Sequence, residues 1–132
     1  MANCEVAVGM FGLHNVYGGD ARGYIEAARL ADAAGIDQVV FTDHVVMGEH
    51  TERYPYGAFP LPPSEPWFEP LTLLAAIAGG TTHIHLATGV LIAPLRPAAL
   101  LAKICATLDA IAPGRVELGV GTPAVVLVRP LL

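Results

Sequence analysis

Two residues capable of acid–base chemistry, Asp43 and His44, stand directly after an apolar run in this sequence. The stretch VVFTDHVVMG covers residues 39–48, so a carboxylate and an imidazole emerge where an apolar strand is expected to end. A histidine suits proton transfer because its unperturbed pKa, about 6.5, lies close to neutrality. The pattern therefore predicts an acid–base site at a strand end. The alternative is structural: an aspartate that closes an Asx turn beside a partly buried histidine.

Other histidines and acids invite a metal-site interpretation, but their positions argue against it. His83 and His85 have the spacing of two ligands on one strand face, yet the pair comes at the start of the strand predicted at residues 85–92. That end of a barrel strand contributes stability rather than chemistry. The acid–histidine pair could also join Glu49 and His50, but these two belong to a loop with no fixed spacing. We therefore expect no metal site.

The elements that must position these residues alternate along the chain. Apolar, β-branched runs predict strands at residues 6–11, 36–42, 85–92 and 115–120. Helices are predicted at residues 20–35 with Asp20 as N-cap, at 70–78 with Pro70 in the first turn, and at 97–112. The last helix places four apolar residues on one stripe: Leu100, Ile104, Leu108 and Ile111. This alternation predicts an α/β fold with a parallel sheet covered on both faces.

One connection is much longer than the others. A loop of 26 residues, 44–69, separates Asp43 from Pro70, whereas a βα connection usually needs only a few residues. The loop follows the carboxyl end of the second strand, the edge at which α/β folds bind ligands. It contains several residues able to face a ligand: Arg53, Tyr54, Tyr56, Trp67 and Phe68. The alternative is a surface loop stiffened by its prolines.

Composition excludes several classes of partner. The 132 residues suit one globular domain, and 7 basic against 12 acidic residues, without a basic cluster, argue against nucleic-acid binding. No window reaches about 18 clean apolar residues and no secretory signal opens the chain, so we expect a cytoplasmic protein that does not enter a membrane. Cys4 and Cys105 are expected to stay reduced thiols.

Four stretches in the same order carry a family pattern: FTDHVV, YPYG, EPLTLLAAIAG and LATGVLIAPLRPAALLAKICATLDAIAPGRVELGVG. Together they resemble the luciferase-like monooxygenase superfamily of flavin oxidoreductases, and within it the branch that uses the deazaflavin coenzyme F-420. The resemblance implies a TIM (β/α)8 barrel with coenzyme at the carboxyl ends of the strands. Residues 1–122 would then form the N-terminal half of that barrel, which ends after the fourth strand.

The resemblance also implies site residues and a reaction. Hydride would pass between F-420 and an unknown small organic substrate, with His44 as the catalytic proton donor or acceptor. Asp43, Thr88, Gly89 and Val90 would bind the coenzyme, and relatives carry a strand bulge with a non-prolyl cis peptide at the bond that corresponds to Gly89–Val90. The alternative for the glycine is packing against a helix. FMN with a monooxygenase reaction is the alternative chemistry.

Residues 123–132 depart from the family pattern, which suggests a change of reading frame or a truncated gene. A complete barrel needs about 250 residues, and its phosphate site generally lies after the seventh and eighth strands. We therefore expect an incomplete enzyme, with a non-catalytic remnant as a further alternative. The first and fourth strands would have unpaired edges, which favours self-association.

Overall fold

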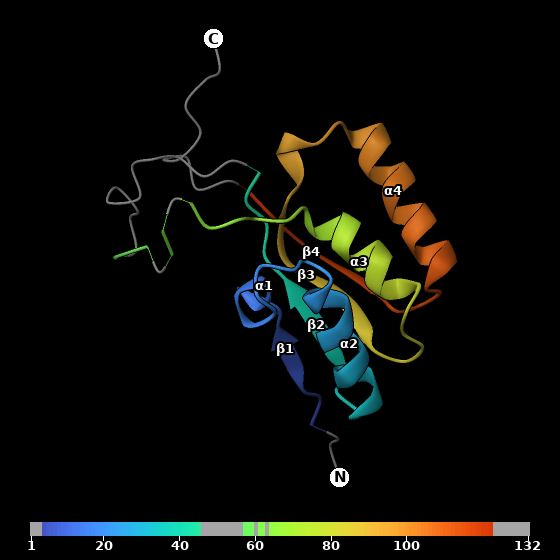
Figure 1. The fold of residues 1–132 in the computed structure, drawn as a ribbon. Helices are drawn as coiled ribbons and strands as arrows, with labels where there is room; N and C mark the ends of the chain where they lie inside the picture. Colours follow the sequence, from blue (N-terminus) through green and yellow to red (C-terminus); the bar gives the residue numbers. More distant parts are fainter. Residues whose placement is uncertain (1–3, 46–56, 60, 63, 123–132) are drawn as a thin grey trace.

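The computed structural model describes residues 4–45, 57–59, 61–62 and 64–122 (Figure 1). Its elements, in chain order, are β1(Ala7–Gly9), α1(Leu13–Val16), α2(Gly23–Ala33), β2(Gln38–Phe41), α3(Pro70–Ala78), β3(His85–Ile92), the 3₁₀ turn η2(Ala93–Leu95), α4(Ala98–Ile111) and β4(Val116–Gly121). The four strands pair in parallel in the order β1-β2-β3-β4. This arrangement confirms the predicted α/β class with parallel strands that alternate with helices.

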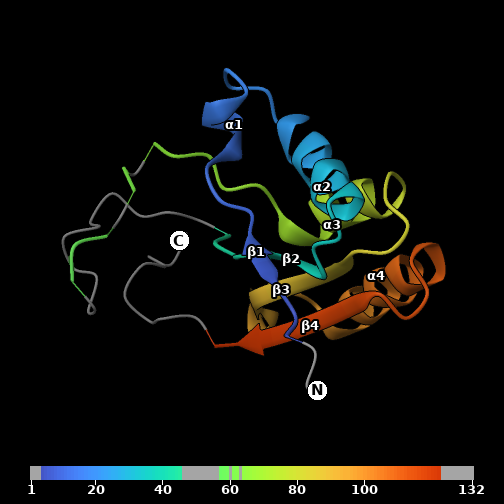
Figure 2. The same ribbon diagram turned by 90° about the horizontal axis from the view of Figure 1, so that it is seen from below.

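Only one face of the sheet is covered by helices among the described residues. Figure 2 shows α2, α3 and α4 on one side of the strands. The strand side chains on that side are buried in the core: Val39, Phe41 and Leu86. On the other side the Gln38 side-chain amide donates to the Glu117 carboxylate (2.7 Å), and His85 Nδ1 lies 2.8 Å from the same carboxylate. The prediction that helices cover both faces is therefore wrong for this part of the chain.

The first helices differ from the predicted pattern. The four-residue helix α1 was not predicted, because so short a helix shows no apolar periodicity. Helix α2 begins at Gly23 with Arg22 as N-cap, so Asp20 is not the N-cap that the sequence suggested. Instead the Asp20 carboxylate accepts the Arg22 backbone N–H at 2.9 Å and stabilises the turn that precedes the helix.

The apolar stripe predicted for α4 is buried at only one of its four residues. Leu108 is in the core, and Ile104 packs against it from a half-buried position. Leu100 and Ile111 are about half exposed, at 55% and 48%. Within the described ranges no element packs over that side of α4, so the sequence pattern alone overestimated its burial.

Both outer strands of the sheet have exposed apolar side chains. Val8 on β1 is 37% exposed, and Val120 on β4 is 61% exposed. In the described part of the chain, β1 pairs only with β2 and β4 pairs only with β3. These two edges are therefore the least covered part of the fold.

Candidate functional site

The predicted acid, Asp43, lies at the carboxyl end of β2 and is buried, with 1% of its side chain exposed. Both of its carboxylate oxygens receive hydrogen bonds from Arg96, at 2.6 and 3.2 Å. Oδ2 also accepts the backbone N–H of Ile92, at 2.8 Å. The carboxylate thus ties the end of β2 to the end of β3. Its predicted contact with a coenzyme stays a prediction.

Arg96 also joins this network to helix α3. Its second guanidinium nitrogen donates to Glu69 Oε1 at 2.9 Å. Glu69 is the N-cap of α3, where its other oxygen accepts the backbone N–H of Thr72 at 2.7 Å and Pro70 occupies the first turn as predicted. Three carboxyl-end segments, after β2, before α3 and after β3, are therefore held by one guanidinium.

His44 follows Asp43 and is half-buried against aromatic rings. Its imidazole contacts the Trp67 indole edge to face, with ring centroids 4.4 Å apart, and Phe59 at 5.9 Å. Burial lowers the pKa of His44 below the ordinary 6.5, and the negative charge of Asp43 opposes this shift without cancelling it. The imidazole is therefore held mainly neutral near pH 7, a state that can accept a proton.

An open hollow of about 460 Å³ lies beside this histidine. We call it the His44 hollow, and its lining residues are Asp43, His44, Val45, Trp67, Glu69, Leu95 and Arg96. Trp67 also lines a second hollow, of about 320 Å³, together with Phe11 and Phe68. The long loop thus contributes a wall to the site, as its length suggested. Of the loop residues named above, Arg53, Tyr54 and Tyr56 lie outside the described residues.

The predicted coenzyme residues of β3 lie at an irregularity in the sheet. The register between β3 and β4 shifts between Thr88 and Leu91, and the Gly89–Val90 peptide bond is cis, which confirms the predicted bulge and isomer. Thr88 is buried, and its hydroxyl donates to the carbonyl of Gly119 at 2.9 Å. Val90 is 46% exposed. The ligand roles of these three residues stay predictions.

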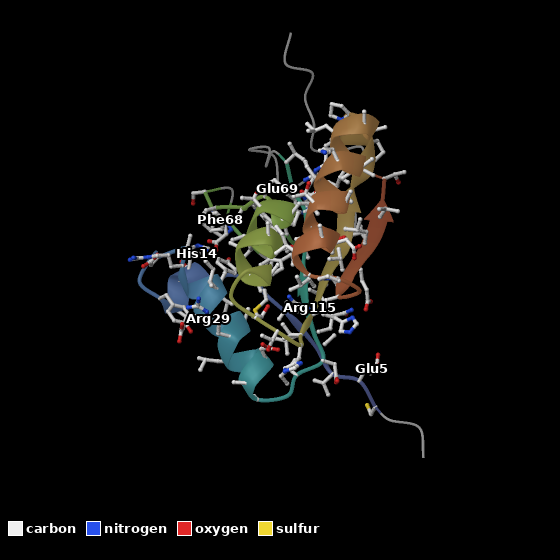
Figure 3. The ribbon with its side chains drawn as sticks, turned by 90° about the vertical axis from the view of Figure 1, so that its right-hand side faces the viewer. Glu5, His14, Arg29, Phe68, Glu69 and Arg115 are labelled. Atoms are coloured by element: carbon white, nitrogen blue, oxygen red, sulfur yellow. The ribbon has the colours of Figure 1, made fainter. Side chains whose placement is uncertain are left out.

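A second cluster near the site was not predicted. His14 is buried between Tyr24, whose hydroxyl is 3.2 Å from Nδ1, and Glu65, whose carboxylate is 3.1 Å from Nε2. Phe68 packs edge to face on the same imidazole, as Figure 3 shows from the side. This cluster holds the end of the long loop against α1 and α2. A lone histidine in a four-residue helix gave no signal from which it could be predicted.

The metal interpretations gain no support from the described residues. His83 is exposed, and His85 pairs with Glu117 at the amino end of the strands, away from His44. No cluster of three or more histidine, cysteine or acidic residues able to hold a metal ion occurs in the described ranges. Glu49 and His50 fall outside them. In the same ranges, no helix is long and apolar enough to cross a membrane.

The His44 hollow suits the ring of a flavin-type coenzyme better than its charged tail. Trp67 and Leu95 provide apolar walls, and the buried indole Nε1 of Trp67 has no hydrogen-bond partner. Arg96, the basic residue of this lining, is already bound to two carboxylates, so its guanidinium is not free for a phosphate. The described residues can therefore hold a ring but offer no evident phosphate site here.

Comparison with curated proteins gives distant relatives. An uncharacterised protein of Mycobacterium tuberculosis is 37% identical over 103 residues, which are 75% of this chain and 36% of that protein. The protein named F420-dependent glucose-6-phosphate dehydrogenase, from Beutenbergia cavernae, is 38% identical over 94 residues, which are 70% of this chain and 24% of that protein. The chain thus spans about a quarter to a third of their lengths.

Solved structures of monooxygenases share the fold. The oxygenating constituent of 3,6-diketocamphane monooxygenase from Pseudomonas putida, solved in complex with FMN, matches with a TM-score of 0.65 and 27% identity over 91% of this chain and 30% of that chain. The structure of apo-MsnO8 matches with a TM-score of 0.66 and 25% identity over 96% of this chain and 34% of that chain. The four-stranded unit thus corresponds to about a third of such proteins.

A family model provides the broadest match. The model described as luciferase-like monooxygenase matches residues 6–125, which is most of the 132-residue chain. The matched region includes every described strand and helix, together with the acid–histidine pair and the β3 bulge. This chain therefore belongs to the luciferase-like monooxygenase family.

Proposed function

We propose that this chain supplies the ring-binding part of a coenzyme site in an oxidoreductase that transfers hydride between deazaflavin F-420 and a small organic substrate. The observation that carries the proposal is His44, a half-buried imidazole with a lowered pKa beside an open hollow at the carboxyl end of β2. The 38% identity with a relative named as F420-dependent supports the choice of coenzyme.

The chain's own residues would divide the work as follows. When bound, the deazaflavin supplies the ring carbon that gives or takes hydride. His44 would give or take the accompanying proton, since its neutral form predominates near pH 7. Thr88, Gly89 and Val90 would flank the ring at the β3 bulge. Asp43 would act close to the coenzyme chiefly by fixing the backbone next to His44, because Arg96 occupies both of its oxygens.

FMN with a monooxygenase reaction is a second candidate, favoured by one observation. The structure of the FMN-bound monooxygenase from Pseudomonas putida matches 91% of this chain. Both coenzymes present a flat tricyclic ring, and the features described around the His44 hollow do not select between them.

A titration with each coenzyme tests the proposal. Purified protein is titrated with F-420 and, separately, with FMN, while coenzyme fluorescence and the histidine resonances in NMR spectra are recorded. We expect F-420 to bind at tens of micromolar or below, and the His44 imidazole signals to shift on binding. His44→Gln and His83→Gln assign the signals, and the exposed His83 serves as the control that should not respond.

The other outcomes discriminate among the alternatives. Tighter binding of FMN, with the same His44 response, would favour the monooxygenase interpretation. Failure of both coenzymes to bind a folded protein would contradict both and leave a non-catalytic role.

We also propose that the chain self-associates through its sheet edges. Val8 on β1 and Val120 on β4 are exposed apolar side chains on the outer strands of the described sheet. Unpaired edges of this kind are templates for strand pairing. Sedimentation velocity at rising protein concentration should show a dimer or larger species, and Val8→Lys should weaken it. A monomer at all concentrations would refute the proposal.

A further inference from the structure

Trp67 is the chain's single tryptophan and has an unsatisfied polar atom in the middle of the site. Its indole packs edge to face against His44 at 4.4 Å and against Phe11 at 5.2 Å, measured between ring centroids. Its ring N–H is shielded from solvent, and no hydrogen-bond acceptor reaches it. Phe11, His44 and Trp67 come from three different segments, so the fold brings this donor to the His44 hollow.

A buried indole N–H is normally paired, because leaving it without an acceptor loses the hydrogen bond that water would otherwise supply. It is the buried side-chain donor that the described residues leave unpaired. Since water does not reach the atom, an acceptor that did reach it would meet no competition from solvent. An unpaired donor in the wall of a hollow therefore indicates where a ligand oxygen would be held.

The charges around the hollow restrict the kind of ligand. Arg96 is engaged by Asp43 at 2.6 Å and by Glu69 at 2.9 Å, so two carboxylates share one guanidinium. This environment has no free cation to attract an anion, and its net charge repels one. A cationic amine, in turn, has no lone pair to offer the indole N–H. The remaining walls, Leu95 and the Trp67 ring, are apolar.

We propose that the Trp67 indole N–H donates to the carbonyl oxygen of a neutral, mainly apolar organic substrate bound in the His44 hollow. This inference rests on the proposed function, because it assigns the substrate class of the same site. The ring contact between Trp67 and His44 would hold the substrate's carbonyl end close to the imidazole that handles the proton. Trp67 is therefore a specificity-determining residue for a carbonyl compound.

The single indole gives the experiment a direct signal. Uniformly ¹⁵N-labelled protein shows one indole N–H resonance, which we would follow during titration with cyclohexanone and with methylenecyclohexane, a probe of nearly the same shape whose C=CH₂ group replaces the C=O. We expect the ketone to move the indole proton downfield, as hydrogen bonding does, and to bind more tightly than the alkene. The alkene should leave the indole proton near its free position.

Trp67→Phe keeps an aromatic ring but removes the donor. It should weaken ketone binding about fivefold, the usual contribution of a neutral hydrogen bond, and leave alkene binding unchanged. Tyr17→Phe, which removes a polar atom from an aromatic residue outside the hollow, should change neither. Histidine resonances report ligand binding in the Trp67→Phe protein and show that it is folded.

Two results would overturn the inference: equal affinity for ketone and alkene, or a ketone affinity that Trp67→Phe does not lower. Either result is independent of the coenzyme titration, since these probes are added without coenzyme. If neither F-420 nor FMN binds while the ketone still shifts the indole proton, the coenzyme proposal fails and the donor assignment stands.

Discussion

The two ends of the parallel sheet use similar polar residues in different ways. Figure 3 labels one residue from each end, Glu69 at the carboxyl end and Arg115 at the amino end. At the amino end, the Arg115 guanidinium donates to the carbonyls of Ala78, Thr81 and Ile84 and to the Thr81 hydroxyl, at 3.1 to 3.3 Å. It thereby caps the carboxyl end of α3 and joins it to β3 and β4.

Asp32 provides a matching acid at the amino end. Its carboxylate accepts three backbone N–H groups, from Thr82, His83 and Ile84, at 2.8 to 3.0 Å. Partial burial alone would raise the pKa of Asp32, but these three donors outweigh it and lower the pKa. Every polar group named at this end has a partner, and the partners are mostly backbone atoms.

The carboxyl end also has an arginine and acids, yet its polar groups are less completely paired. Arg96 binds Asp43 and Glu69, but His44 has its pKa lowered by burial and the Trp67 N–H has no partner. Such unsatisfied groups cost stability and persist where a ligand uses them. The comparison teaches that the amino end stabilises this unit, whereas the carboxyl end retains groups for chemistry, as in other α/β barrels.

The largest expected effect breaks the carboxyl-end ion pair. Asp43→Asn leaves Arg96 without a charge partner at its shortest contact, 2.6 Å, and should lower the free energy of unfolding by about 3 kcal/mol. It should also lower the pKa of His44 further, because the negative charge that opposes the burial effect is gone. Urea denaturation and NMR titration of His44 measure the two effects.

The matched control for that variant is Asp20→Asn, which alters an exposed ion pair with Arg22. It should change neither stability nor the pKa of His44, because exposed pairs contribute little. Arg96→Gln, in contrast, should raise the pKa of His44 by leaving the Asp43 carboxylate uncompensated. Shifts of the same sign in Asp43→Asn and Arg96→Gln would contradict this account of the network.

A smaller effect is expected at the close approach of β3 and β4. A Cβ added at Gly119 would lie 2.3 Å from the backbone carbonyl oxygen of Thr88, so Gly119→Ala must push the strands apart at the β3 bulge. We expect a loss of about 2 kcal/mol in the free energy of unfolding. Gly9→Ala on β1 is the control, since a Cβ there meets nothing within 4 Å. Equal stabilities for the two variants would refute the packing argument.

The amino-end arginine provides the next test. Arg115→Met keeps the aliphatic part of the side chain but removes the donors to Ala78, Thr81 and Ile84, and should cost about 1 to 2 kcal/mol because the carbonyls are part-buried. The pKa of His44 should not move, which distinguishes this end from the other. Arg22→Met, at an 87% exposed side chain, is the matched control for stability. A shifted His44 titration in Arg115→Met would blur the division between the ends.

The smallest expected effect is the pH dependence due to His44. Its folded-state pKa lies below the unfolded value of about 6.5, so the unfolded chain binds the proton first as pH falls. Stability from the neutral imidazole is therefore complete above pH 6.5 and declines as pH falls toward the folded-state pKa. His44→Gln should flatten this part of the stability curve, whereas His83→Gln should leave it unchanged. An identical slope in His44→Gln and the native protein would contradict the lowered pKa.

The elements with regular patterns could be predicted from sequence. Strand β3 has the predicted bounds, 85–92, because eight consecutive residues carry an uninterrupted strand pattern. Helix α3 begins at Pro70 as expected from the geometry of proline in a first turn. Asp20 was misassigned because a carboxylate that stabilises a turn and one that caps a helix have the same local sequence. The coverage of the sheet was misjudged because an apolar strand does not reveal which of its faces is packed.

The sequence by itself determined the alternation of strands and helices, the position of Asp43 and His44 at a strand end, and the irregularity at Gly89 and Val90. These features depend on local periodicity and on residue types close together in the chain. Only the tertiary structure decided that Arg96, 53 positions from Asp43, takes its carboxylate, and that Trp67 packs on His44. Such contacts join loops without a repeating pattern, and they form only when the parallel strands bring their carboxyl ends to one edge.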